Sequence, residues 1–265
     1  MSREHEDHAA FVSLLVARML DAQGLDPEGA EIVADSLRAN GRPDGWQRPS
    51  RFYPGLTAQP WYDPDEFEWT AGLRGAFPRI RDEALALRRH ERFAIDPLSV
   101  NLAEGNWNEI RFYTEGRPST GNLASCPETA AALAEIPGAA TAGLVFLSAT
   151  GPHTHLRPHC GPHNARLRCQ LGLVMPKGSR LRVGPETRSW DAGELVVFDD
   201  SFEHELWNDS AETRIVLIVD IWHPDLSPSQ VVGIRLGEMA LVTHAYELAE
   251  SWVRTGSVAA PGAWA

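Results

Sequence analysis

The spacing of apolar residues changes once along this chain, near residue 106, from a helical period of about 3.6 to a period of two. Upstream of that point, the pattern predicts two helices within the first forty residues. The apolar stripe of the first helix consists of Phe11, Leu14, Leu15 and Met19. Asp26-Pro27-Glu28 begins the second, with an N-cap residue, a proline in the first turn and an acidic first turn.

Two further segments precede the change in period. The passage from Arg42 to Pro64 is rich in proline, glycine and aromatic residues, so we expect an ordered wrap around the core without regular structure. From Pro78 to His90 the spacing of Ile80, Ala84 and Leu87 predicts another helix.

After residue 106, short runs of β-type residues alternate with clusters of glycine, proline and asparagine. The predicted strands are Trp107 to Tyr113, Gly143 to Ala149, Arg166 to Met175, Arg180 to Val183, Glu194 to Phe198 and Arg214 to Trp222. This succession predicts an antiparallel sandwich or barrel with flanking helices. A last helix is expected to carry Val242, Ala245, Ala249 and Trp252 on one side. We therefore expect a helical and irregular segment over residues 1–105, a β core over 106–225, and a C-terminal helix and tail over 226–265.

Composition and charge exclude several classes of partner and location. The 265 residues carry a net charge of −12, which argues against a nucleic acid or an anionic membrane as the main partner. Three widely spaced cysteines do not form a disulfide framework, and the acidic amino terminus resembles neither a signal peptide nor a spanning helix. We expect a cytoplasmic protein, and nothing in the pattern specifies an oligomeric state.

Candidate chemistry lies in the β part. The strand Arg166-Leu-Arg168-Cys-Gln170 places polar residues on one face, which lines either solvent or a polar cavity. Four histidines lie within the eleven positions from His153 to His163, and His204 and Arg214 follow. Dense histidines are typical of metal sites, although each histidine alone is more often structural. The acidic run Asp199, Asp200 and Glu203 either orients an imidazole or forms a solvated turn.

Several motifs in succession resemble the aspartyl/asparaginyl β-hydroxylases. They are Arg157-Pro-His159-Cys-Gly-Pro-His-Asn-Ala-Arg166-Leu-Arg168, Trp190-Asp-Ala-Gly-Glu-Leu-Val-Val-Phe-Asp-Asp-Ser-Phe-Glu-His204-Glu, Arg214, and Ile221-Trp-His-Pro-Asp-Leu, within a similarity over roughly residues 50–228. The resemblance implies a double-stranded β-helix, or jelly-roll core, and an oxygenase that uses Fe(II), 2-oxoglutarate and O2. It also implies hydroxylation at the β-carbon of an aspartyl- or asparaginyl-type substrate, with release of succinate and CO2.

The resemblance also assigns roles. It implies His159 and His204 as the metal ligands and catalytic residues, with Gly161 at the position where most of the wider superfamily has a carboxylate. The residues implied for binding 2-oxoglutarate are Ser148, Arg168, Gln170 and Arg214, and those implied for binding the substrate are Arg166 and Trp107.

The sequence departs from the family at three positions. Gln170 stands where a histidine is common, Thr150 where the animal enzymes have methionine, and Leu102 where a second substrate-binding arginine is expected. The hundred or so residues ahead of the core show no thirty-four-residue period of the kind expected for a helical-repeat module. We therefore expect a compact substrate: a free amino acid, a carrier-bound aminoacyl group or a short peptide.

The sequence suggests three alternative functions, of which the first two remain open. A non-catalytic, cupin-like protein that binds a metal or a small ligand fits the same strands. A related oxygenase could halogenate or desaturate its substrate. A zinc hydrolase is disfavoured because no H-E-x-x-H motif or equivalent is present.

Overall fold

The computed structural model describes residues 3–22, 24–38, 45–95 and 99–239. It divides into two compact units, one of residues 1–42, 51–56 and 224–265, and the other of residues 43–50 and 57–223. Residues 57–105, part of the segment expected ahead of the β core, group with that core in the second unit. The predicted helix with Val242 to Trp252 lies outside the described residues.

The first unit is helical in its described residues. It contains α1 (Arg3–Asp21), α2 (Glu28–Arg38) and a helical stretch over residues 228–239. The predicted cap of α2 is present, because the Glu28 amide donates to Oδ1 of Asp26 at 2.9 Å. The stripe predicted for α1 is displaced: Leu14 and Leu15 are exposed, and Val12, Val16 and Leu20 are buried instead. Several apolar residues on a short helix allow more than one stripe, and packing against α2 selects among them.

The second unit is built on two antiparallel sheets. In order along the larger sheet lie β1 (Trp61–Tyr62), β11 (Leu195–Phe198), β8 (Arg166–Val174), β13 (Arg214–Trp222), β6 (Leu144–Thr150), β4 (Trp107–Thr114) and β2 (Ala94–Ile95), with β5 (Arg117–Pro118) beside β4. In order along the smaller sheet lie β10 (Glu186–Arg188), β9 (Ser179–Val183), β12 (His204–Asn208), β7 (Thr154–His159) and β3 (Leu102–Glu104). From β6 to β13 the chain passes repeatedly between the sheets, which confirms the predicted double-stranded β-helix.

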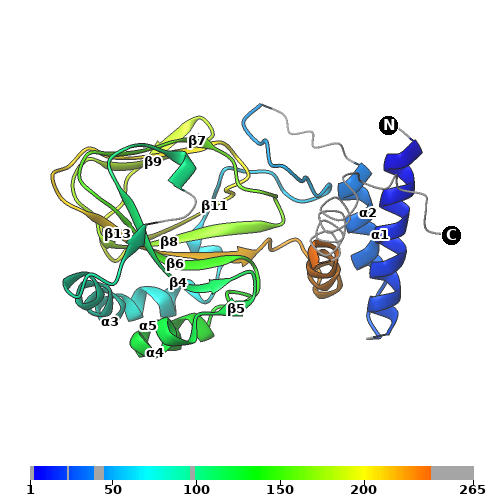
Figure 1. The fold of residues 1–265 in the computed structure, drawn as a ribbon, viewed down its shortest axis with the longest axis horizontal. Coiled ribbons are helices and arrows are strands. Elements are labelled where there is room, and N and C mark those ends of the chain that lie inside the picture. The colour runs from blue at the N-terminus through cyan, green and yellow to red at the C-terminus, as the bar shows by residue number, and fades with distance from the viewer. Residues whose placement is uncertain (1–2, 23, 39–44, 96–98, 240–265) are drawn as a thin grey trace, which may run out of the picture. The chain divides into compact units, whose positions relative to one another are not determined.

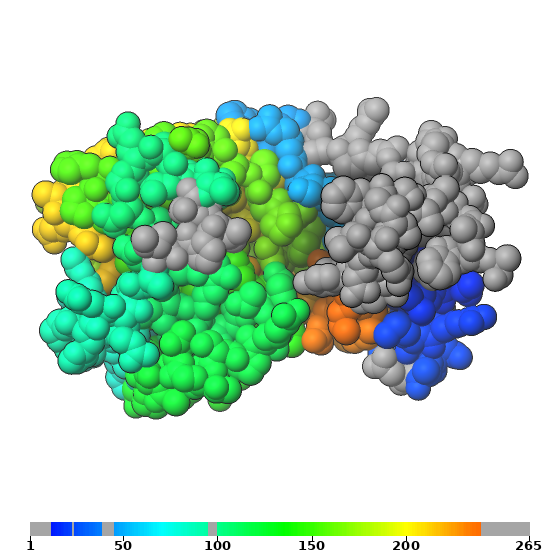
Figure 2. Space-filling view, in the orientation of Figure 1, coloured from blue at the N-terminus to red at the C-terminus, as the bar shows by residue number. Residues whose placement is uncertain are grey.

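Helices cover only one face of the larger sheet. α3 (Thr70–Arg89), α4 (Thr120–Ser125) and α5 (Pro127–Ala134) lie on the face turned away from β7 and β9 (Figure 1). Their side chains form the lower surface of the β unit in the space-filling view (Figure 2). Short 3-10 turns at Pro64–Glu66 and Ser99–Asn101 complete the described elements. The predicted apolar positions Ile80, Ala84 and Leu87 of α3 are buried, as expected.

Alternation along the strands separates two cores. Odd-numbered residues of β8, such as Leu167 and Leu171, pack with the helices, whereas Phe146, Val216 and Ile218 pack between the two sheets. By the same alternation, Arg166, Arg168 and Gln170 lie on the face of β8 that is turned toward the smaller sheet. The polar face predicted for this strand therefore lines the interior of the barrel.

Candidate metal and oxo-acid site

His159 and His204 lie side by side on the smaller sheet. They are direct partners in the register of β7 and β12, and the centroids of their rings are 4.1 Å apart. A bulge brings them together: from the pair Leu156–Leu206, β7 takes three residues to reach His159, whereas β12 takes two to reach His204. Bulges re-aim side chains in this way, and here the extra residue turns His159 to the interior face that Leu156 shares.

Two other histidines of the cluster, His155 and His163, make different contacts. His155 does not share the face of His159: its Nε2 lies 2.8 Å from Oε1 of Glu205, and its ring stacks on Trp207. A common orientation of His155 and His159, which strict alternation would give, is therefore wrong, because the bulge intervenes. His163 is buried, and its Nδ1 accepts the Ala165 amide at 3.2 Å.

Both imidazoles are prepared to bind a metal through Nε2. Nδ1 of His159 donates to the carbonyl oxygen of Arg157 at 2.7 Å, and Nδ1 of His204 donates to that of Phe202 at 3.0 Å. A carbonyl only accepts hydrogen bonds, so each Nδ1 holds a proton and each Nε2 has a free lone pair. Burial, with the positive charge of Arg168, lowers the pKa of His159, and burial lowers that of His204 further.

A third side chain lies next to this pair. The carboxylate of Asp200 is fully buried, and neither of its oxygens accepts a hydrogen bond from a described residue. A Cβ atom on Gly161 would lie 2.3 Å from Oδ1 of Asp200. The carboxylate therefore fills the space beside Gly161, although it comes from a different part of the chain. Among the described residues, no set of three histidine, cysteine or acidic side chains is arranged to hold a metal.

Two arginines and two aspartates form a buried network beside the histidines. Arg168 donates to Oδ1 of Asp220 from Nε at 2.8 Å and to Oδ2 from Nη2 at 3.1 Å, and its Nη1 lies 3.2 Å from Oδ2 of Asp200. Arg166 is also buried, with Nη1 3.3 Å from Glu115 and 3.6 Å from Asp220. These carboxylates raise the pKa of both guanidinium groups, while the arginines lower the pKa of Asp220.

Arg214, at the start of β13, is a buried cation that pairs with no carboxylate of a described residue. Its side chain is 1% exposed, Nη2 donates to Oε1 of Gln170 at 2.7 Å, and Nη1 has no hydrogen-bond partner among the described residues. The indole ring of Trp190 lies against the guanidinium, with 5.3 Å from Cζ to the ring centroid. Burial alone lowers the pKa of Arg214 to about 9. A buried charge without a counterion is costly, so this geometry is suited to bind an anion.

Hydroxyl groups line the strand beside Arg214. Thr150 is the register partner of Arg214, and its buried hydroxyl has no hydrogen-bond partner among the described residues. Ser148, two positions earlier on the same face of β6, accepts the indole N–H of Trp107 at 3.0 Å and keeps its own proton to donate. Trp107 is half-buried.

The sequence-predicted residues thus fall into groups. His159 and His204 form the histidine pair, and Arg168 is ion-paired with Asp200, which lies next to that pair. Gln170 contacts Arg214, Ser148 contacts Trp107, and Arg166 is paired with acidic side chains. Sequence reasoning missed Asp220, whose signal is a lone acidic residue in an apolar strand. Of the two interpretations that the sequence left open for the acidic run, the solvated turn is wrong for Asp199 and Asp200, because both are fully buried.

A jelly-roll barrel with a histidine pair and a buried arginine defines a cupin-like class of protein. Within that class, a family model for aspartyl/asparaginyl β-hydroxylase matches residues 75–224, and the chain belongs to this family. The human aspartyl/asparaginyl β-hydroxylase is 40% identical over 192 residues, which cover 70% of this chain and 25% of the relative. This chain therefore spans about a quarter of that relative's length.

Other relatives have different names. The ornithine lipid ester-linked acyl 2-hydroxylase of Rhizobium tropici is 34% identical over 200 residues, covering 72% of this chain and 70% of the relative. A solved prolyl hydroxylase from Trichoplax adhaerens, in complex with a peptide fragment of hypoxia inducible factor, is 12% identical with a TM-score of 0.39, covering 60% of this chain and 81% of that one. Within the described residues, no helix is both long and apolar enough to cross a membrane.

Proposed function

We propose that this chain is an Fe(II)- and 2-oxoglutarate-dependent hydroxylase. The observation that carries the proposal is the buried guanidinium of Arg214, which has a free Nη1 and no carboxylate partner among the described residues. It shares the barrel with two imidazoles whose Nδ1 atoms donate to backbone carbonyls, which leaves each Nε2 as the nitrogen with a lone pair for a metal. An oxo diacid has one end that chelates a metal and another that binds a guanidinium, so the two features complement each other.

The residues around the histidine pair fit Fe(II). His159 and His204 would hold the ion, and the negative charge of Asp200, which acts on His159, would favour a cation there. When bound, the ion couples oxidative decarboxylation of 2-oxoglutarate by O2 to hydroxylation, so that succinate, CO2 and a hydroxylated product form. Arg168 holds Asp200 in position, because it also grips Asp220 through two hydrogen bonds.

The remaining residues orient the oxo acid and the substrate. Arg214 binds the distal carboxylate, Gln170 holds Arg214 rather than acting as a primary ligand, and Ser148 donates its hydroxyl proton to the same carboxylate. Arg166 and Trp107 stay the candidates for the substrate. Since Arg166 is already paired with acidic side chains, a substrate carboxylate would have to displace Glu115, which is half-exposed.

We further propose that the substrate is an aspartyl- or asparaginyl-type compound, hydroxylated at the β-carbon. The family supports this substrate class. The three free cysteines are in keeping with a reducing, cytoplasmic location.

The test is substrate-dependent succinate formation. Purified chain with Fe(II) is offered free aspartate and asparagine, carrier-bound aminoacyl groups, short peptides and acyl compounds, and product masses separate hydroxylation from desaturation and halogenation. Coupled turnover with an aspartyl or asparaginyl compound is expected, and Arg214→Met should lose it. Turnover with the acyl compounds alone would replace the substrate assignment, and failure of the chain to bind 2-oxoglutarate would favour the non-catalytic binder.

A further inference from the structure

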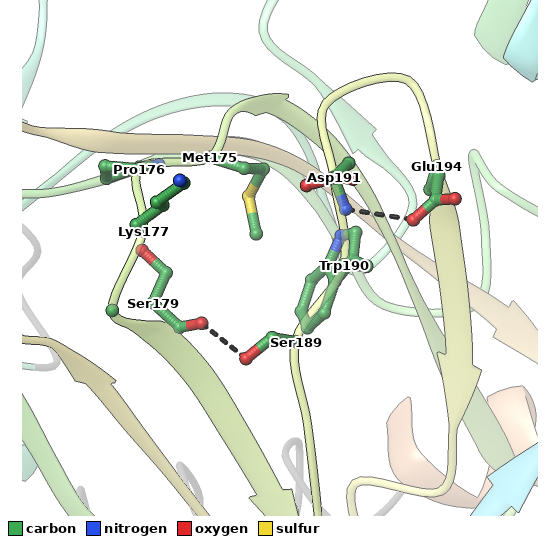
Figure 3. A pocket seen from close by; sticks show the side chains of 9 residues that line it. Met175, Pro176, Lys177, Ser179, Ser189, Trp190, Asp191 and Glu194 are labelled. Carbon is green, nitrogen blue, oxygen red and sulfur yellow. Dashed lines mark hydrogen bonds between the residues drawn. The ribbon is translucent and has the colours of Figure 1, made fainter.

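Trp190 lies between the guanidinium of Arg214 and a surface pocket. One contact of the indole is with Arg214, at 5.3 Å from Cζ to the ring centroid. The same side chain lines a pocket of about 310 Å³ together with Met175, Lys177 and Ser189. Figure 3 shows the Trp190 ring at the edge of this pocket and the Met175 side chain directed into it. Arg214 itself does not line the pocket, so the indole separates the anchor from the open space.

A glycine on β8 makes room for this arrangement. A Cβ atom on Gly172 would lie 2.7 Å from Cγ of Met175 and 3.2 Å from Nε1 of Trp190. Gly172 follows Gln170 on the inward face of the strand, so Trp190 and Met175 occupy the place that the next inward side chain would take. The side chain of Trp190 is thereby fixed by packing from the barrel side, and it is 9% exposed.

The position of the Arg214 guanidinium depends on few contacts. Gln170 holds Nη2 at 2.7 Å, and the indole of Trp190 backs the guanidinium. Nη1 remains free for a carboxylate. The length of an oxo diacid that can reach both the histidine pair and Nη1 therefore depends on how far the guanidinium can move, and the indole that packs against the guanidinium restricts this movement.

We propose that Trp190 is a specificity-determining residue, which selects the length of the oxo diacid by keeping the Arg214 guanidinium at a fixed distance from the histidine pair. The inference rests on the proposed function and adds to it the residue that discriminates between oxo acids differing by one methylene. A smaller side chain at position 190 removes the ring packed against Arg214 and opens the guanidinium to the pocket that Trp190 lines, so the anchor can move to accommodate a longer acid.

The experiment measures binding rather than turnover. Dissociation constants of 2-oxoglutarate and of 2-oxoadipate, which is one methylene longer, are determined by calorimetry on the Fe(II)-loaded chain without oxygen. The wild-type chain should prefer 2-oxoglutarate by about 10–200-fold, the usual discrimination for one methylene. Trp190→Ala should reduce this ratio by about tenfold or more, and Trp190→Phe by less, since a phenyl ring still backs the guanidinium.

Lys177→Ala is the matched control, because Lys177 lines the same pocket and should leave the ratio unchanged. Trp190→Phe provides the answer if Trp190→Ala does not fold. A ratio that stays constant in the Trp190 variants overturns the role of Trp190 and leaves the proposed function intact. A wild-type chain that binds neither acid overturns the proposed function as well, and a ratio that changes equally in Lys177→Ala assigns the discrimination to the pocket instead of the indole.

Discussion

The buried carboxylate of Asp200 occupies the space that a side chain at Gly161 would need. A Cβ atom on Gly161 would lie 2.3 Å from Oδ1, 2.5 Å from Cγ and 2.7 Å from Oδ2 of Asp200. Asp200 cannot easily move away, because it is fully buried and ion-paired with Arg168. The absence of a side chain at position 161 is thus what leaves room for the carboxylate of Asp200.

Gly161→Ala should therefore destabilise the fold. The new methyl group must displace a buried, paired carboxylate, and overpacking of this kind costs about 1–3 kcal/mol. Urea unfolding of the two proteins measures the loss. Gly121→Ala is the control, since an added Cβ at this exposed position of α4 meets nothing within 4 Å. Equal stability of Gly161→Ala and the wild type would show that Asp200 does not fill this space.

Arg214→Met should stabilise the chain in the absence of 2-oxoglutarate, by roughly 1–3 kcal/mol. Burial lowers the pKa of Arg214 from 12.5 to about 9, so at pH 7 the group is charged in both folded and unfolded states, and the folded state bears the full desolvation cost. That cost would diminish only as the pH rises from about 9 toward 12.5. Thermal unfolding at pH 7 measures the difference.

The same variant should lose its response to the oxo acid. A ligand that binds only the folded state raises the unfolding temperature, so 2-oxoglutarate should stabilise the Fe(II)-loaded wild type and not Arg214→Met. Lower stability of the variant without ligand, or an undiminished response to 2-oxoglutarate, would remove Arg214 from its assigned place.

Asp199 should give stability a dependence on pH near neutrality. Burial raises the pKa of this carboxyl to about 7, despite hydrogen bonds from the Ser201 amide and from Gln47. Because the folded pKa lies above the unfolded value of 3.8, its contribution is fully present below about pH 4 and is lost as the pH rises through 7. Relative to Asp199→Asn, the wild type should lose up to roughly 4 kcal/mol between pH 4 and pH 8.

Chemical unfolding across this pH range tests the expectation. Asp82→Asn is the control, because it removes an exposed carboxylate of α3. Parallel profiles for the wild type and Asp199→Asn would mean that Asp199 titrates in the folded protein as it does in the unfolded chain.

Alternating patterns made the barrel largely predictable. The strands found from sequence, such as β8 and β13, have long apolar faces buried under α3 to α5. The two longest strands missed are β7 and β12, which carry the two histidines; the two- and three-residue strands β1, β2, β3, β5 and β10 were not predicted either. Both are short, and β7 contains Pro158 and a bulge, so neither shows a clean period of two.

The sequence could single out a site residue where its assignment depends on its own position in a motif, and the assigned roles stay predictions. His159, His204 and Arg214 are of this kind. Asp200, Asp220 and Trp190 act through contacts between strands distant in sequence, and a linear pattern does not contain the register that brings them together. Gln170 shows the difference best: its contact with the oxo acid stays a prediction, whereas its hydrogen bond with Arg214 joins two strands and is not contained in the motif.

The measurement that tests the central claim most directly is the visible charge-transfer absorption that forms when an oxo acid chelates Fe(II), recorded without oxygen. The account predicts this band for the wild-type chain with Fe(II) and 2-oxoglutarate. It predicts the band also for His155→Ala, whose imidazole lies outside the barrel against Glu205 and Trp207, and its loss in the double variant His159→Ala and His204→Ala. No band in the wild type, or an undiminished band in the double variant, would contradict the assignment of the histidine pair as the iron site.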